Sequence, residues 1–110
     1  MVQIKNLRNE KPRFEYQVKV DRTSVLGNPF YMATEAQRDE VCDKYAEYFE
    51  EKLKNDASFL IELGRLYELH KQFGKLELFC WCAPKRCHAE TIKKFLEVKG
   101  DYYEARGWTA

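Results

Sequence analysis

The stretch KLELFCWCAPKRCHAETIKKF, residues 75–95, decides the fold that this sequence predicts. It starts directly after Gly74, a residue type that commonly ends helices, and its first eight residues are mostly apolar, which indicates a buried strand. From Ala89 onward apolar residues recur at helical spacing, so we expect a helix that ends near Gly100. A strand, a short polar connection and a helix therefore follow one another in this part of the chain.

Two alternating segments near the N-terminus predict further strands. The segments MVQIKNL (residues 1–7) and FEYQVKV (residues 14–20) alternate apolar with polar side chains, as half-buried strands do. In the second segment we expect one face of the strand to carry Phe14, Tyr16, Val18 and Val20.

Two helices are predicted in the middle of the chain. Thr34 and Gln37 match the capping-box pattern, and apolar residues then recur at helical spacing as far as Leu53, which predicts a helix at about 34–54. Asp56 is a typical N-cap and Gly74 is a typical C-terminal stop, so a second helix should lie between them.

The order of these elements favours a small single-domain α/β fold that spans residues 1–110. Because helices separate the strands that end near Val20 and Cys82, we expect these two strands to be parallel. The predicted architecture is a Rossmann-like layer fold with a mostly parallel sheet flanked by helices. Open sheets of this kind bind ligands beyond the carboxyl ends of their strands, so the loops after Val20 and Cys82 are the expected site.

Composition and charge exclude several classes of function. Of the 110 residues, 45% are hydrophobic and 34% are charged, which indicates a packed domain rather than a disordered chain. The formal net charge of +1 supplies no bulk attraction to nucleic acid or to an anionic membrane. No apolar stretch approaches the roughly 20 residues that span a bilayer, and no signal peptide is evident, so we expect a cytoplasmic protein with reduced cysteines. Homo-oligomerisation is left open.

Three of the four cysteines lie between positions 80 and 87. Cys80 and Cys82 are two residues apart, so on a strand they share a face, and both suit a protein core. Together with Cys87 and His88 they also form a set of ligands that zinc accepts, although their spacing differs from that of common structural zinc sites. We therefore predict no metal or other cofactor and keep a zinc site as the alternative.

The segment PKRCH (residues 84–88) is the stronger candidate for chemistry. Cys87 is expected at the start of a helix and beside Lys85 and Arg86, where backbone N–H groups and cations lower the pKa of a thiol. Cys87 and His88 are therefore the candidate catalytic residues, as nucleophile and base. Without covalent chemistry, the same four residues form an expected anion site at the helix start that suits a phosphate.

The loop DRTSVLGNPFY (residues 21–31) is the second candidate region. Gly27, Asn28 and Pro29 predict a tight turn in which Gly27 is free to adopt a positive φ. The loop offers polar donors and acceptors and aromatic rings for stacking, and an ordinary strand-to-helix connection is the alternative. The candidate ligand-binding residues in and after this loop are Arg22, Ser24, Gly27, Asn28, Phe30 and Arg38.

These segments resemble a widespread bacterial and phage domain family whose function is uncharacterised. The resemblance covers about residues 18–96 and rests on the GNPF loop, on Arg38 near the start of the next helix and on the CWC-x-P-x-x-CH signature of residues 80–88. It implies that both loops belong to one site, and it names no reaction. A looser similarity links the chain to Rossmann-like domains such as cytokinin-releasing phosphoribohydrolases, but their Pro-Gly-Gly-x-Gly-Thr loop and paired glutamate are absent here.

On these grounds we expect the chain to bind a nucleotide or a phosphorylated small molecule at the two loops. Phe30 or Trp81 would stack on the ligand, and a phage-type binder of nucleotide signals would fit this description. One alternative is a Cys/His-dependent enzyme that acts on a nucleotide-like substrate, and another is a zinc-stabilised interaction module. The sequence leaves open whether the protein is an enzyme.

Overall fold

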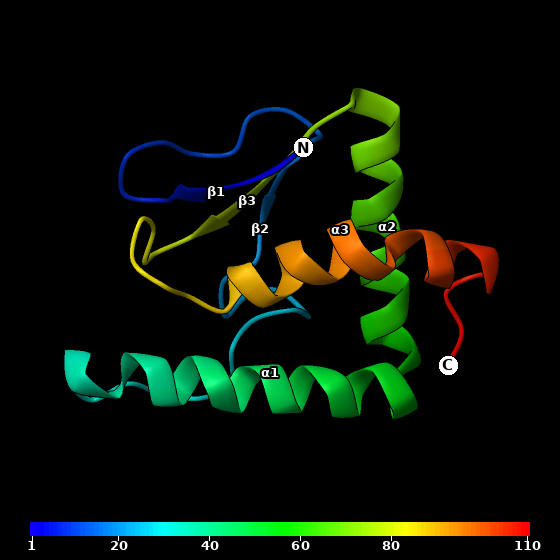
Figure 1. Ribbon diagram of the computed structural model, residues 1–110. Coiled ribbons are helices and arrows are strands. Elements are labelled where there is room, and N and C mark those ends of the chain that lie inside the picture. Colours follow the sequence, from blue (N-terminus) through cyan, green and yellow to red (C-terminus); the bar gives the residue numbers. More distant parts are fainter.

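The sheet is built around β3 (Leu76–Cys80). In the computed structural model, which describes residues 1–110, β1 (Val2–Asn6) and β2 (Gln17–Lys19) pair with opposite edges of β3, both in parallel (Figure 1). All five residues of β3 are buried, which explains why this strand reads as a continuous apolar run. Its one charged residue, Glu77, accepts a hydrogen bond from Gln17 Nε2 at 2.9 Å. The predicted parallel sheet is confirmed, and the chain forms a small α/β domain.

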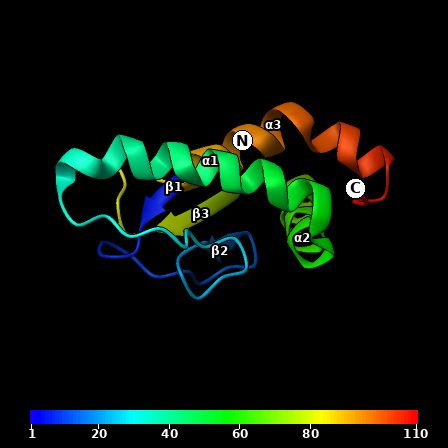
Figure 2. The ribbon, with the colours of Figure 1, turned by 90° about the horizontal axis from the view of Figure 1, so that it is seen from below.

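Three α-helices complete the domain: α1 (Arg38–Asn55), α2 (Ala57–Phe73) and α3 (Ala89–Ala105). Helices α1 and α3 run alongside each other, and α2 runs across both of them (Figure 1). Seen from below, α1 lies nearest the viewer, with the sheet and the other two helices behind it (Figure 2). Aromatic side chains fill the space among the helices, and Phe49 contacts both Phe59 and Phe95 with ring centroids 5.2 Å apart. No helix combines the length and the apolar character that crossing a membrane requires.

Helix α2 begins and ends where its local sequence predicts. The Asp56 carboxylate accepts a hydrogen bond from the Phe59 N–H at 3.1 Å, which satisfies one of the free donors at the helix start. At the other end Gly74 has a φ of 72° and its N–H donates to the His70 carbonyl at 2.9 Å. Both predicted signals are confirmed.

Helix α1 starts slightly later than the sequence pattern predicts. Gln37 Oε1 accepts hydrogen bonds from the Ala33 and Thr34 N–H groups at 2.8 and 3.4 Å, as a capping residue should. The turn that it caps is a 3-10 helix, η1 (Glu35–Gln37), and the α-helical pattern begins only at Arg38.

Strand β2 is much shorter than the alternating pattern predicts, so the expected strand over 14–20 is wrong in its first half. Gln17 Oε1 accepts hydrogen bonds from the Arg13 and Phe14 N–H groups at 2.7 and 3.0 Å, which holds the chain in a turn before the strand. Phe14 is 55% exposed and stacks on Tyr16 with ring centroids 5.5 Å apart. Only Val18 and Val20 of the expected face enter the core.

Helix α3 continues past Gly100, where the sequence pattern predicts its end. Gly100 lies under the ring of Tyr67, and a Cβ at position 100 would be only 2.1 Å from Tyr67 Cε1. The glycine therefore serves a close contact between α2 and α3 rather than a helix stop, and the helix extends to Ala105.

Candidate functional site

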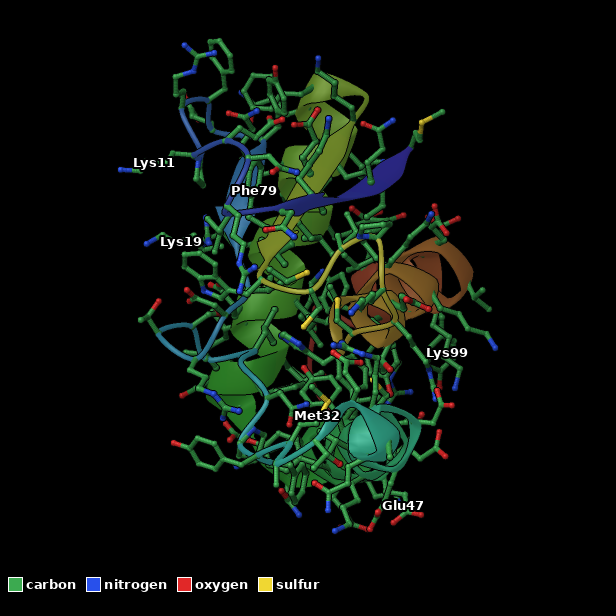
Figure 3. All side chains as sticks on the ribbon, turned by 90° about the vertical axis from the view of Figure 1, so that its left-hand side faces the viewer. Lys11, Lys19, Met32, Glu47, Phe79 and Lys99 are labelled. Atoms are coloured by element: carbon green, nitrogen blue, oxygen red, sulfur yellow. The ribbon has the colours of Figure 1, made fainter.

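A cavity of about 500 Å³ lies at the carboxyl ends of β2 and β3. The loop after β2, the first turns of α1 and the segment after β3 form its wall. Figure 3 looks onto this end of the sheet, where Met32 marks the wall between the loop and α1. The structure therefore brings together the two regions that the sequence singles out. The predicted site residues on this wall are Arg22, Asn28, Phe30, Arg38, Arg86, Cys87 and His88.

Three predicted residues, Ser24, Gly27 and Lys85, are not on the cavity wall. Ser24 Oγ accepts a hydrogen bond from the Leu26 N–H at 3.0 Å and so shapes its own turn. Gly27 does not use the positive φ that its residue type permits, since Gly74 and Gly107 are the glycines with positive φ. Gly27 instead permits a close approach of backbone, since a Cβ there would lie 2.3 Å from the Asp21 carbonyl oxygen.

Arg22 holds the loop after β2 in place. Its guanidinium donates to the carbonyl oxygens of Asn28 and Phe30 at 2.6 and 2.9 Å, and it lies 4.0 Å from the centre of the Tyr31 ring. Tyr31 is 81% exposed. The loop therefore presents an aromatic ring to solvent at the cavity, with a cation directly against it.

Arg38 and Arg86 tie α1 to the segment after β3. Arg38 donates to the Arg86 carbonyl at 2.9 Å and makes a two-pronged pair with Glu35, whose pKa is lowered to about 2 by these bonds. Arg86 pairs with Asp39 and Asp43, each at 2.9 Å. Both arginines thus face the cavity while they are held by carboxylates, Arg38 by one on η1 and Arg86 by two on α1.

The start of α3 differs from the open anion site that the sequence predicts. Lys85 lies 3.4 Å from Glu35, and the Cys87 N–H donates to Glu90 Oε2 at 3.3 Å. Carboxylates of the chain itself therefore pair with Lys85 and Arg86, the cations of the predicted anion site, and one carboxylate accepts a hydrogen bond from a backbone N–H at the helix start. An anionic ligand would have to replace these contacts.

Cys80 and Cys87 are both buried, with their sulfur atoms 3.1 Å apart. The hydrogen bond from Cys87 and the N–H groups of Cys82 and Ala83 lower the pKa of Cys80 to about 6. The pKa of Cys87 is raised instead, because its proton is held by Cys80 and because the thiol is buried. The expectation of a lowered pKa at Cys87 is therefore wrong, and the group that favours the thiolate form is its partner.

His88 is buried, and its Nε2 donates to the Val20 carbonyl at 2.5 Å. Burial lowers the pKa of His88, so the ring is neutral near pH 7. Its ring meets Tyr45 edge-on with centroids 5.0 Å apart, and no hydrogen bond joins it to Cys87. The side chain links the end of β2 to the start of α3.

Cys42 is the member of the site that the sequence reasoning missed. It lies on α1, and with Cys80, Cys82 and Cys87 it brings all four cysteines to one cavity. The available signal was its spacing of four residues from Arg38, which places both on one helix face. No group of three or more Cys, His, Asp or Glu side chains is arranged to hold a metal ion in this structure.

Comparison with known proteins gives a family match. The model of a family described as Domain of unknown function (DUF4326) matches residues 2–98, a range that includes both loops of the cavity. No curated protein and no solved structure matches the chain.

Proposed function

The chain belongs to the DUF4326 family, and from the geometry of its cavity we propose that it binds a nucleotide or another phosphorylated small molecule at the carboxyl ends of β2 and β3. The observation that carries the proposal is one cavity that combines cations with exposed aromatic rings. Its volume of about 500 Å³ lies within the range of small-molecule sites.

The charges on the wall favour an anionic ligand. Arg22, Arg38 and Arg86 line the cavity against a single carboxylate, that of Asp21. Planar guanidinium groups bind phosphate oxygens in pairs, and the carboxylates that now hold Arg86 are exposed surface groups that a phosphate can replace. The phosphate would therefore lie between α1 and the segment after β3.

The aromatic rings favour a ligand with a planar part. Trp81 is 54% exposed, and its Nε1 lies 3.4 Å from Asp21 Oδ2, which orients the indole beside the loop after β2. Tyr31 presents its ring from that loop, backed by Arg22. A base that stacks on either ring would contribute on the order of 1–3 kcal/mol.

We extend the proposal to the fold and to the biological role. Ligand binding beyond the carboxyl ends of parallel strands is the arrangement of Rossmann-like sheets. A protein that binds without turnover would act by sequestering its ligand, as a phage-type binder of nucleotide signals would. The alternative of a Cys/His-dependent enzyme receives less support, because Cys87 is hydrogen-bonded to Cys80 and His88 to the Val20 carbonyl rather than to each other.

Calorimetric titration of the reduced protein tests this function. The panel contains nucleotides, the matching nucleosides and inorganic phosphate. We expect one site, with the best nucleotide bound at least about tenfold more tightly than its nucleoside, because charge-assisted bonds to phosphate are lost in the nucleoside.

Two variants locate the site. Arg22→Gln and Arg38→Gln should each weaken binding about tenfold or more, whereas Arg8→Gln, an exposed arginine outside the cavity, should leave the affinity unchanged. Circular dichroism verifies that each variant is folded. Absence of binding across the panel, or equal affinity in all three variants, would refute the proposal.

A further inference from the structure

The thiols of Cys80 and Cys87 are poised for chemistry of their own. Cys80 ends β3 and Cys87 lies two residues before α3, yet their sulfur atoms are only 3.1 Å apart. A disulfide bond is about 2.05 Å long, so a shift of roughly 1 Å would join them. No other hydrogen bond joins two cysteine sulfurs in the chain.

The two thiols are unequal, as a nucleophile and a resolving thiol must be. The two sulfurs share one hydrogen bond, and the backbone N–H groups of Cys82 and Ala83 are directed at Cys80, whereas only that of Ala89 is directed at Cys87. The larger number of backbone donors favours a thiolate on Cys80. The pKa of Cys87 is raised by its contact with Cys80 and by burial, which favours the protonated thiol. The backbone N–H groups around the two sulfurs therefore distinguish the two thiols.

Access to the pair favours a small reactant. Cys80 and Cys87 are 1% and 5% exposed, so a bulky disulfide cannot approach either sulfur in line with the bond to be broken. Both residues nevertheless line the cavity of about 500 Å³, which a hydroperoxide can enter.

We propose that Cys80 and Cys87 form a dithiol redox site whose substrate is a small hydroperoxide. The Cys80 thiolate attacks an oxygen of the peroxide, so that an S–O bond forms, the O–O bond breaks and the alcohol leaves with a proton from solvent. The Cys87 thiol then attacks the Cys80 sulfenic acid, which forms the disulfide and releases water. The dithiol loses two electrons and the peroxide gains them.

The cycle closes with a thiol reductant. Two equivalents of a low-molecular-weight thiol reduce the disulfide and are themselves joined as a disulfide. This activity goes beyond the proposed ligand binding and does not depend on it, because it uses the sulfur atoms of the cavity rather than its arginines.

Peptide mapping tests the proposal on the unmodified chain. The reduced protein is treated with one equivalent of hydrogen peroxide, free thiols are alkylated, and trypsin cleaves after Lys85 and Arg86, which separates the two cysteines. We expect peptide 76–85 linked to peptide 87–93, with tandem mass spectrometry placing the bond on Cys80 and alkylation on Cys42 and Cys82. Four alkylated thiols, or a bond to Cys82, would overturn the proposal.

Variants separate the two roles. In Cys87→Ser the link is lost and Cys80 accumulates as a sulfenic acid that a dimedone probe captures, whereas in Cys80→Ser neither product forms. The matched control Cys42→Ser retains the link. Labelling of Cys87 in Cys80→Ser would contradict the assignment.

Rates test the class of substrate. Peroxide should oxidise the pair in the folded protein about tenfold faster at pH 7 than in the denatured chain, because a lowered pKa increases the thiolate fraction. Glutathione disulfide at the same concentration should react more slowly than peroxide. The reverse order would overturn the hydroperoxide assignment.

Discussion

The two ends of the molecule are packed in opposite ways. Helices α2 and α3 cross at one end of the molecule (Figure 1). There Gly100 of α3 lies directly under the ring of Tyr67, and Gly64 of α2 lies under the ring of Trp108 from the C-terminal tail. At the carboxyl ends of β2 and β3, polar side chains hold loops around a cavity of about 500 Å³. The contrast indicates that substitutions at the helix crossing change stability, whereas substitutions at the cavity change binding and thiol chemistry.

The largest effect is expected for Gly100→Ala at the helix crossing. The new Cβ would lie 2.1 Å from Tyr67 Cε1, and the Tyr67 ring cannot yield freely because its hydroxyl donates to Asp101. We expect the free energy of unfolding to fall by about 2–3 kcal/mol, since overpacking outweighs the gain in helix propensity of about 1 kcal/mol. Urea denaturation measures this change.

A control and a double variant sharpen this prediction. Lys99→Ala, at an exposed position of the same helix, should change stability by less than about 0.5 kcal/mol. Adding Tyr67→Leu to Gly100→Ala should cost less than the sum of the single changes, because both act on one contact. Additive losses would show that the contact is not the cause.

A smaller loss is expected for Tyr45→Phe, which lies between the two regions. The Tyr45 hydroxyl donates to the Leu26 carbonyl at 2.7 Å and so joins α1 to the loop after β2. Its removal leaves a buried carbonyl without a partner, so the free energy of unfolding should fall by about 1–2 kcal/mol. The control Tyr48→Phe should change it by less than about 0.5 kcal/mol, and equal losses would contradict the assigned role.

Mild acid should lower the stability of the folded protein mainly through His88, which lies at the cavity end of the molecule. Burial keeps the pKa of His88 below its ordinary value of 6.5, so below that pH the unfolded chain takes up a proton that the folded chain resists. Stability should therefore fall as the pH drops through 6.5 towards the folded-state pKa, and it should be unaffected by this group above pH 7. Melting temperatures between pH 7.5 and 5 measure the effect.

The two histidines of the chain allow a matched comparison. His88→Gln should flatten the pH profile while it retains a donor for Val20. The pKa of His70 is lowered too, by its partial burial and by the Met1 amino group, which lies 2.7 Å away at the other end of β1. His70→Gln should flatten the profile less, because His70 is less buried. A larger effect of His70→Gln would reverse the comparison.

The smallest change in stability is expected for Arg86→Gln on the cavity wall. Its pairs with Asp39 and Asp43 are exposed, so their loss should cost less than about 1 kcal/mol. Affinity for a phosphorylated ligand should nevertheless fall severalfold. Arg65→Gln removes a similar pair, with Glu62 at 2.7 Å, outside the cavity, and should leave affinity unchanged. Equal affinities in the two variants would show that the arginine on the cavity wall has no special role in ligand binding.

Local signals predicted much of the fold. Asp56 and Gly74 define α2 through hydrogen bonds within a few residues, and the apolar run of β3 reflects burial of every residue in it. The local signals gave a wrong prediction where a contact with a residue far away in the sequence determines the structure. Gly100 has the sequence signature of a helix end, but Tyr67 on α2 makes it an interior position of α3.

The sequence predicted which residues form the candidate site better than it predicted their chemical properties. Seven predicted residues line one cavity, because the loops after parallel strands meet at one edge of the sheet. The environment of Cys87 was not predicted, since a helix start suggests a lowered thiol pKa and only the position of Cys80 reverses it.

The sequence by itself determined that three helices follow the N-terminal strands in the observed order along the chain, that the strands are parallel, and most of the residues that line the cavity. These depend on periodicity and on capping bonds between near neighbours. Only the tertiary structure decided which groups pair there. Arg86 reaches Asp43 across 43 positions, and His88 reaches Val20 across 68, because β2 and β3 lie side by side while α1 and α2 separate them along the chain. Contacts over such separations follow from packing, which no local pattern encodes.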